Sequence, residues 1–464
     1  MSQLVLTQII IETNAPLAIN SGGRETGFDS ELARDANQLP YIPATAIAGV
    51  WRHLAEDRLG TEITNQWFGN IGNDGESSRL YIHDGLLLDS TGQPTQGLQV
   101  AEHIQKDPLL RLLHQQRPHH RERVRINDRG VAADQGKFDQ IMLPTGVRFC
   151  LQVRWQGAAD NTEQQQQWQA LLELLTQPDF ALGSSTRNGL GRFNIIADRT
   201  KALKLHNNPT AGVELQRFIK REQLPSKRTL NASIYTPFAT LGLTALDGWR
   251  CGQGSRPIGQ NVDSHTDSFT YSEPVIRWQH GKAQCNDEYQ VVLCGSSIKG
   301  ILAHRLAYHY NRHTQAYAEQ IADASHKQWQ ARPSGLRELL GETEDPEQNL
   351  AGCLFVDDTV IHNPATLVRT HTSIDRFTGG VRQGVLFSEE LLWQPTFELV
   401  LRLAPNTTLS PALADALRDT LNDLKHGLLP MGAGSGRGNS LVEHQSNQVW
   451  QIDWSQVNTG EQAQ

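Results

Sequence analysis

Two stretches of the chain share one pattern of apolar and small residues. The first reads YIPATAIAGVWRHLAEDRLG from Tyr41, and the second reads VVLCGSSIKGILAHRLAYHYN from Val291. Each begins with a short apolar run, passes through small residues, and then places apolar residues three or four positions apart. This pattern predicts a strand, a turn and an amphipathic helix in both places.

The match continues along the chain in the same order. RLYIHDG pairs with CLFVDDT, which aligns Asp84 with Asp358. INDRG from Ile126 pairs with SIDRF from Ser373, and each is followed by an alternating strand and a helix with leucines on one face. Both helices run into a glycine-rich turn, LGSSTRNGLGRF in the first half and MGAGSGRGNSLV in the second. Five matched blocks in one order predict a tandem duplication.

The order of elements in each half is strand, helix, strands, helix, glycine turn and strand. This order predicts an α+β fold of two tandem ferredoxin-like (RRM-like) domains with long inserted loops. We expect the first domain at 1–200, a polar linker without a matched partner at 201–225, and the second domain at 226–464. The irregular stretches 85–125 and 245–290 are long enough to be functional or disordered loops.

Composition excludes some classes of protein and leaves others open. No run approaches the ~18 apolar residues of a membrane span, so no membrane partner is expected. The 5 cysteines are scattered without a C-x-x-C pair, which argues against a disulfide framework and predicts a cytoplasmic, reduced protein. The net charge of −8 gives nucleic-acid binding no support, although a local positive groove on an acidic body would suffice.

Taken together, these motifs resemble the RAMP superfamily of CRISPR proteins, in particular the repeated backbone subunit of type III effector complexes. That family carries an I-P-G-S-S-[LI]-K-G turn and helix and a terminal G-x-G-x-R-G-x-G loop. The second half keeps both nearly intact, at Gly295–Gly300 and Gly432–Gly438. The first half keeps the turn at Ile42–Gly49 and the loop as STRNGLGRF, but it has Ala48 where the second half has Lys299.

The resemblance implies a tandem fusion of two backbone subunits. Such a chain would bind guide RNA and cleave paired target RNA with the help of a divalent cation, for which Mg²⁺ is expected. Its partners would be guide RNA, target RNA, and the other RAMP-type and large subunits of the complex. The alternative is a non-catalytic RNA-binding scaffold. A guide-processing nuclease would need a histidine-centred site, and His53 and His304 are expected to be helix-surface residues instead.

In the resembling family, the RNA-cutting residue is an aspartate in the loop before the I-P-G-S-S strand. Asp29 falls at that position, and Asp35 is a weaker rival. A plain loop carboxylate that makes a local turn is the alternative for Asp29. In the second half the matching position falls on Ser272, which cannot act as that carboxylate, so Asp267 or Glu273 would have to substitute.

RNA-binding residues are expected at the helix N-termini and the glycine loops. A helix N-terminus offers backbone N–H groups and a partial positive charge to phosphate, although hydroxyls there can equally cap the helix. An arginine among glycines suits close approach to RNA, although a tight turn needs glycine as well. The RNA-binding candidates are Thr45, Arg52, Arg187, Arg192, Ser296, Ser297, Lys299 and Arg437.

Other candidate chemistry is less specific. The most basic segment is RPHHRERVR at 117–125, which is either a solvated loop or an RNA contact. Zinc ligands among Cys251, His265, His280 and Cys285 lack paired spacing, so no metal ligand is assigned. The chain carries no phosphate loop, no H-E-x-x-H and no G-x-S-x-G, which leaves ATPase, zinc-protease and esterase activity without a motif.

Overall fold

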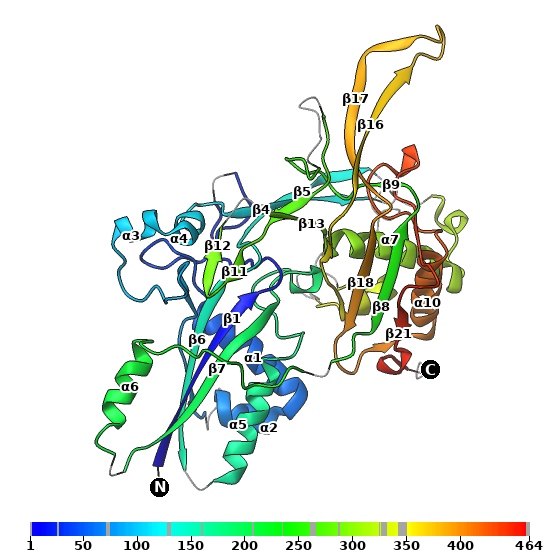
Figure 1. Cartoon of the computed structure of the whole chain (residues 1–464). Helices are drawn as coiled ribbons and strands as arrows, with labels where there is room; N and C mark the ends of the chain where they lie inside the picture. The colour runs from blue at the N-terminus through cyan, green and yellow to red at the C-terminus, as the bar shows by residue number, and fades with distance from the viewer. Residues whose placement is uncertain are drawn as a thin grey trace.

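The computed structural model shows an α+β protein with two halves that contact each other (Figure 1). The structure describes residues 2–460 except 26, 71–74, 128–130, 159–160, 207, 234, 260–265, 286–287, 324, 326–331 and 342–349.

The first half is built on an antiparallel sheet with helices on one face. Its strands lie in the order β2-β6-β1-β7, and β3 also pairs with β6. Side chains of β1 that point to one side pack with α1 and α5 in a core containing Ile9, Trp51 and Trp168. The elements are β1 (Ser2–Thr13), α1 (Ala44–Leu59), α2 (Thr61–Phe68), β2 (Leu80–Ile82), β3 (Leu86–Leu87), β6 (Arg148–Ala158), α5 (Thr162–Leu174) and β7 (Phe193–Lys204).

The second half repeats this arrangement. Its main sheet has the order β14-β18-β8-β20, which matches β2-β6-β1-β7 strand for strand. In both halves, the first strand of the repeat lies between the third and the fourth. The elements are β8 (Ala239–Ala245), α7 (Gly295–His313), β14 (Leu354–Val356), β18 (Thr396–Leu403), α10 (Pro411–Lys425), β20 (Val442–Glu443) and β21 (Trp450–Ile452), which also pairs with β8.

One hydrogen bond shows that the two halves correspond residue by residue. Asp84 Oδ1 accepts a hydrogen bond from the N–H of Ala44, the first residue of α1, over 2.7 Å. Asp358 Oδ1 accepts from the N–H of Gly295, the first residue of α7, over 2.7 Å. The alignment of Asp84 with Asp358 is therefore confirmed, and so is the duplication.

The segment expected as a polar linker packs against the first half. β7 continues to Lys204, and α6 (Ala211–Ile219) follows it. Phe218 of α6 is buried with Leu4, Leu6 and Leu203, on the face of the first sheet away from α1 and α5. Both faces of β1 are therefore covered.

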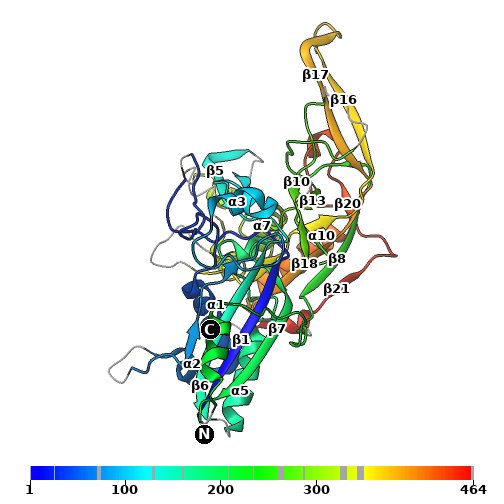
Figure 2. The same ribbon diagram turned by 60° about the vertical axis from the view of Figure 1, so that its left-hand side comes forward.

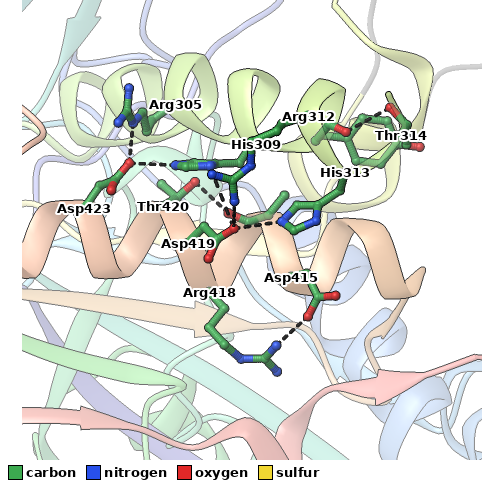
Figure 3. Close-up of polar contacts among 12 residues, drawn as sticks. Arg305, His309, Arg312, His313, Thr314, Asp415, Arg418, Asp419, Thr420 and Asp423 are labelled. Carbon is green, nitrogen blue, oxygen red and sulfur yellow. Dashed lines mark hydrogen bonds and ion pairs between the residues drawn. The ribbon is translucent and has the colours of Figure 1, made fainter. Parts of the chain in front are cut away.

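The two long helices of the second half are held together by ion pairs (Figure 3). Asp423 of α10 accepts from Arg305 Nε over 2.5 Å and from His309 Nε2 over 2.6 Å. One helical turn away, Asp419 binds His313 Nε2 over 2.7 Å. His309 is buried, so this contact fixes how α7 lies on α10.

Two β-hairpins interrupt the repeat at the same point of each half. The first is β4 (His119–Ile126) with β5 (Ala132–Met142), and the second is β16 (Thr366–Ile374) with β17 (Val381–Trp393). The second hairpin projects far from the body (Figures 1 and 2). The SIDRF motif runs from the end of β16 into the second turn, where Asp375 accepts from the backbone N–H groups of Phe377 and Thr378. Residues 128–130 of INDRG lie outside the described residues.

The long loops expected at 85–125 and 245–290 are partly regular structure. In the first, Asp107 caps α4 by accepting from the N–H groups of Leu109 and Leu110, a local interaction that hydropathy does not reveal. The further elements are α3 (Ala101–Lys106), α4 (Pro108–Leu113), β9 (Gly248–Trp249), β10 (Ser272–Pro274), β11 (Arg277–Gln279), β12 (Lys282–Gln284), β13 (Tyr289–Leu293), α9 (Arg337–Leu340), β15 (Thr359–Ile361), β19 (Thr408–Leu409) and β22 (Asn458–Thr459).

The glycine loop of the first half docks on the second half. This loop contains the short 3₁₀ turn η1 (Thr186–Asn188), which contacts α7 and β14. Arg187 Nε donates to the carbonyl of Gly352 over 2.5 Å, and Arg192 pairs with Asp357 over 2.6 Å. Gly189 has a φ of 95°, and a Cβ there would lie 2.4 Å from Asp358 Oδ1, so only glycine fits this contact.

Candidate functional site

Asp29 and Asp267 occupy equivalent places beside the two hairpins. Asp29 Oδ2 accepts from the backbone N–H of Asp139 in β5 over 3.1 Å. Asp267 Oδ2 accepts from the N–H of Ser388 in β17 over 2.8 Å. Both carboxylates are exposed at the base of a hairpin, each at the second strand.

The residue after each aspartate is bound to the same strand, which fixes the correspondence. The hydroxyl of Ser30 accepts from the N–H of Ile141 over 3.0 Å, and the carbonyl of Ser268 accepts from the N–H of Glu390 over 2.9 Å. A repeated Asp-Ser pair is thus the sequence signal that identifies Asp267. Ser272, where the matching position was expected, lies instead in β10, paired with Val291 of β13.

Glu273, the other second-half candidate, is a structural residue. Its carboxylate pairs with Arg121 of β4 and accepts from the hydroxyl of Tyr271, and it is 1% exposed between the two halves. Burial would raise the pKa of Glu273, but Arg121 and His119 outweigh burial and hold the pKa well below its usual value. A carboxylate so enclosed and so strongly paired has no access to RNA, and the expectation for Glu273 is corrected.

Phe28, the residue before Asp29, contacts one aromatic and one cationic side chain. The neighbouring Phe28 packs edge-on against His120 of β4, with the ring centroids 5.6 Å apart. The guanidinium of Arg117 lies 4.2 Å from the Phe28 ring centroid. Most of the basic segment 117–125 therefore lies in β4 (His119–Ile126) beside the Asp29 loop, instead of in a free solvated loop.

A similar group lies near Asp267, on the strand that holds it. Phe387 stacks on His371 with the ring centroids 4.9 Å apart, and Arg437 lies 5.5 Å from the Phe387 centroid. Arg437 also pairs with Glu389 over 3.3 Å. Burial would raise the pKa of Glu389, but Arg437 and His371 outweigh it and keep the pKa below its usual value.

The glycine loops reach the hairpins in both halves. Gln140 of β5 donates to the hydroxyl of Ser184 over 2.6 Å, and Glu389, at the matching position of β17, binds Arg437. The aspartate loop, the second hairpin strand and the glycine loop therefore meet in each half. Gln140 and Glu389 are the joining residues, and the sequence motifs contain neither of them.

Several expected RNA-binding cations are engaged inside the protein. Arg187 and Arg192 hold the two halves together, as described above. Arg52 donates to the carbonyl of Gly69 over 2.6 Å. Lys299 Nζ donates to the carbonyl of Leu354 over 3.0 Å, and burial lowers its pKa to about 8. Each of these four side chains is therefore bonded within the protein, whereas the motifs suggested free cations.

The helix N-termini are partly occupied by carboxylates. Because Asp84 and Asp358 take the first N–H of α1 and α7, a phosphate there would lie beside a negative charge. The N-cap residue of α7 is Cys294, so Ser296 and Ser297 are not its cap. Thr45 and Ser297 are exposed, and their contact with RNA stays a prediction.

The described residues contain one cluster with the geometry for a metal ion, and neither Asp29 nor Asp267 belongs to it. It consists of Asp89, His103 and Asp107. Asp107 already caps α4, and Asp89 Oδ1 accepts from the N–H groups of Thr91 and Gln93, so both carboxylates hold their own loops.

The zinc candidates are not brought together in the described part of the chain. The buried Cys251 thiol donates to the carbonyl of Val292 over 3.4 Å, and burial raises its pKa to about 12. Cys285 is half-buried elsewhere, and His265 lies outside the described residues.

Comparison with known proteins agrees with the duplicated architecture. The model of the RAMP superfamily matches residues 10–194 and 286–443, one region in each half. The chain therefore belongs to the RAMP superfamily, and it contains two RAMP-like parts. No curated protein matches it.

Among solved structures, the chain is similar to a chain described as "Cryo-EM structure of the Type III-B Cmr-beta bound to cognate target RNA". The sequence identity is 16%, the TM-score is 0.29, and the match covers 44% of this chain and 61% of that chain. This chain thus matches less than two thirds of its neighbour. No helix in the described part of the protein is long and apolar enough to cross a membrane.

Proposed function

We propose that the chain is a double backbone subunit of a type III CRISPR RNA-guided effector complex. Each half would be a ferredoxin-like domain that binds guide RNA and cuts the paired target RNA. The family membership and the strand order shared by the two sheets support this reading. The partners would be guide RNA, target RNA and the other subunits of the complex.

The observation that carries the proposal is the equivalent placement of Asp29 and Asp267. An exposed carboxylate at this position can accept the proton of a target 2′-hydroxyl as its oxygen attacks the adjacent phosphate. The bond from phosphorus to the 5′-oxygen breaks, the 5′-oxygen takes a proton from water, and the products are a cyclic phosphate and a 5′-hydroxyl. Two equivalent carboxylates in one chain make two cuts.

Asp29 and Asp267 could each bind a divalent cation only together with RNA. Mg²⁺ commonly binds one or two carboxylates plus phosphate oxygens and water. Asp29 or Asp267 would supply the carboxylate and the RNA would supply the phosphate, and the cation would stabilise the charge on the phosphate. Among the described residues neither aspartate belongs to a ready-made cluster of protein ligands.

The side chains around the two aspartates support contact with RNA strands. Aromatic rings such as Phe28 and Phe387 can stack on bases, and Arg117 and Arg437 can bind phosphate. Phosphate contacts carry no sequence preference, so base pairing with the guide would supply it.

The test is target cleavage by complexes assembled with guide RNA and carrying Asp29→Ala, Asp267→Ala or both. Each single variant should lose one cut, and the double variant should lose both, with guide binding unchanged. Glu25→Ala, in the same loop as Asp29, is the matched control and should leave every cut in place. If the double variant still gives the wild-type ladder, the chain is an RNA-binding scaffold and other subunits cut.

A further inference from the structure

A buried carboxylate orients His371 of β16. The Nε2 atom of His371 lies 2.7 Å from Oε1 of Glu389, which is on the neighbouring strand β17 and is 1% exposed. A carboxylate only accepts hydrogen bonds, so Nε2 carries the proton of this contact. Glu389 is itself held by Arg250 Nε at 3.3 Å and by the side-chain amide of Asn439 at 3.1 Å. The imidazole is therefore fixed through one of its two nitrogens.

The other ring nitrogen of His371, Nδ1, makes no hydrogen bond within the part of the chain that the structure describes. The ring stacks on Phe387, with centroids 4.9 Å apart and planes at 22°, and the stack holds its orientation. The side chain of His371 keeps 18% of its surface exposed. A histidine that is oriented by a carboxylate through one nitrogen and unbonded at the other is the arrangement that transfers protons in catalytic triads.

Asp267 and His371 lie on opposite edges of β17. The strand that carries His371 pairs with one edge of β17, and Ser268, the residue after Asp267, forms a bridge on the other edge. Asp267 Oδ2 accepts from the N–H of Ser388, and the preceding residue, Phe387, stacks on His371. Neighbouring strands lie about 4.8 Å apart, so the two flanking backbones are about 10 Å from each other. A base and an acid so placed can reach the two ends of one phosphodiester linkage.

The first half has the matching carboxylate but a different group across the hairpin. The residue before the one that binds the aspartate is a phenylalanine in both hairpins, Phe138 in β5 and Phe387 in β17. Its partner on the other strand is Arg123 in the first hairpin and His371 in the second. The guanidinium of Arg123 lies 5.9 Å from the Phe138 centroid. Because a guanidinium keeps its proton in proteins, this position can donate a proton to a substrate only in the second half.

We propose that His371 is the general acid of the second-half cleavage site, with Asp267 as the base and Glu389 as the residue that positions the imidazole. The inference rests on the proposed cleavage of target RNA, and it adds the group that protonates the leaving oxygen. The ligand is an RNA phosphodiester whose 2′-hydroxyl lies at Asp267 and whose 5′-oxygen lies at His371.

The protons of this step balance. Asp267 takes the proton of the 2′-hydroxyl as the 2′-oxygen bonds to phosphorus. The bond from phosphorus to the 5′-oxygen breaks, and the Nδ1 proton of the His371 imidazolium passes to that oxygen, in place of a proton taken directly from water. Water afterwards returns a proton to His371 and removes one from Asp267. The charged carboxylate of Glu389 stabilises the positive ring while it holds the proton.

The test uses complexes assembled with guide RNA and follows the cut that Asp267→Ala removes. His371→Gln should slow this cut about 100-fold or more, as is usual when a general acid is lost. Glutamine keeps an amide N–H for Glu389 but has no proton to give. The first-half cut in the same target and the binding of guide RNA should both be unchanged, and they show that the complex is intact. If His371→Gln alters either of them, His371→Asn is measured in its place.

Thr370→Ala is the matched control variant. Thr370 precedes His371 in β16, and its hydroxyl lies 3.0 Å from the hydroxyl of Ser388. Successive side chains of a strand point to opposite faces, so Thr370 lies on the face away from the imidazole. Both cuts should keep their wild-type rates in this variant.

A target with sulfur in place of the 5′-oxygen at the second-half cut separates proton transfer from positioning. A thiol is far more acidic than an alcohol, so the sulfur leaves without being protonated. His371→Gln and the wild type should therefore cut this target at equal rates, whereas Asp267→Ala should still fail to cut it. A purely structural role of His371 would slow the cut in both targets alike.

Two results overturn the proposal: a His371→Gln complex that cuts the ordinary target at the wild-type rate, or one that cuts the sulfur target as slowly as the ordinary one. Failure of the proposed function gives a different result, because Asp267→Ala would then leave the second cut in place.

Discussion

Arg121 of β4 and Glu273 of β10 form an ion pair that is almost fully buried between the two halves. Arg121 also binds Asp358 over 2.5 Å, so it links the first hairpin to the carboxylate at the start of α7. Burying these charges is costly unless all of them are paired. The network therefore fixes the relative position of the halves more than it adds stability.

Arg121→Met should destabilise the protein by about 3–5 kcal/mol, because it leaves Glu273 and Asp358 buried without their cation. Chemical denaturation measures this change. Arg148→Met, which removes a partly exposed pair with Glu12, is the matched control and should cost far less. Equal losses of unfolding free energy in the two variants would show that the buried ion pair contributes no more to stability than the partly exposed one.

The sequence predicted the elements of the fold better than the contacts of the candidate site residues, for physical reasons. Hydrophobic spacing and glycine positions are local properties, and they located the repeated strands, the helices and both glycine loops. The hydrogen-bond and ion-pair partners of a side chain, in contrast, can lie far away in the sequence. Arg187 and Lys299 carry motif positions typical of phosphate contacts, yet each donates to a carbonyl within the protein. Glu273 is a carboxylate near the expected position, and only the packing of β4 against β10 shows that it is enclosed.

Arg437 and Lys299 should now separate in RNA-binding experiments. Arg437→Ala should flatten the salt dependence of RNA binding by the contribution of about one phosphate, a change in slope of ~0.7 for a single strand. Lys299→Ala should leave that slope unchanged and lower the melting temperature, because Lys299 Nζ binds the carbonyl of Leu354. Filter-binding titrations over salt measure the slopes.

Arg418→Ala is the control for the RNA-binding series. Arg418 is an exposed cation of α10 that pairs with Asp415, away from the hairpins. It should change neither slope nor melting temperature appreciably. A slope that falls for Lys299→Ala as much as for Arg437→Ala would return Lys299 to the RNA-binding set.

The contact between α7 and α10 should give acid sensitivity. Burial would raise the pKa of Asp423, but its bonds to His309 and Arg305 outweigh burial and lower the pKa. The carboxylate thus contributes stability that is present above its unfolded pKa of about 4 and is lost as pH falls through the lower folded value. As the pH is lowered below about 5, where carboxylates begin to titrate, the melting temperature of Asp423→Asn should fall less than that of the wild type. Asp415→Asn, whose partner Arg418 is exposed, should follow the wild-type curve.

Gly189 and Gly438 form a matched pair that isolates the docking of the two halves. Both have positive φ, 95° and 82°, so an alanine should cost each a similar amount of backbone strain, of order 1 kcal/mol. A Cβ at Gly438 would meet nothing within 4 Å, whereas a Cβ at Gly189 would lie 2.4 Å from Asp358 Oδ1 and 2.7 Å from its backbone nitrogen. Gly189→Ala should therefore lose clearly more stability than Gly438→Ala, and the difference measures the interface. Equal melting temperatures for the two variants would mean that the glycine loop of the first half does not press on Asp358 in solution.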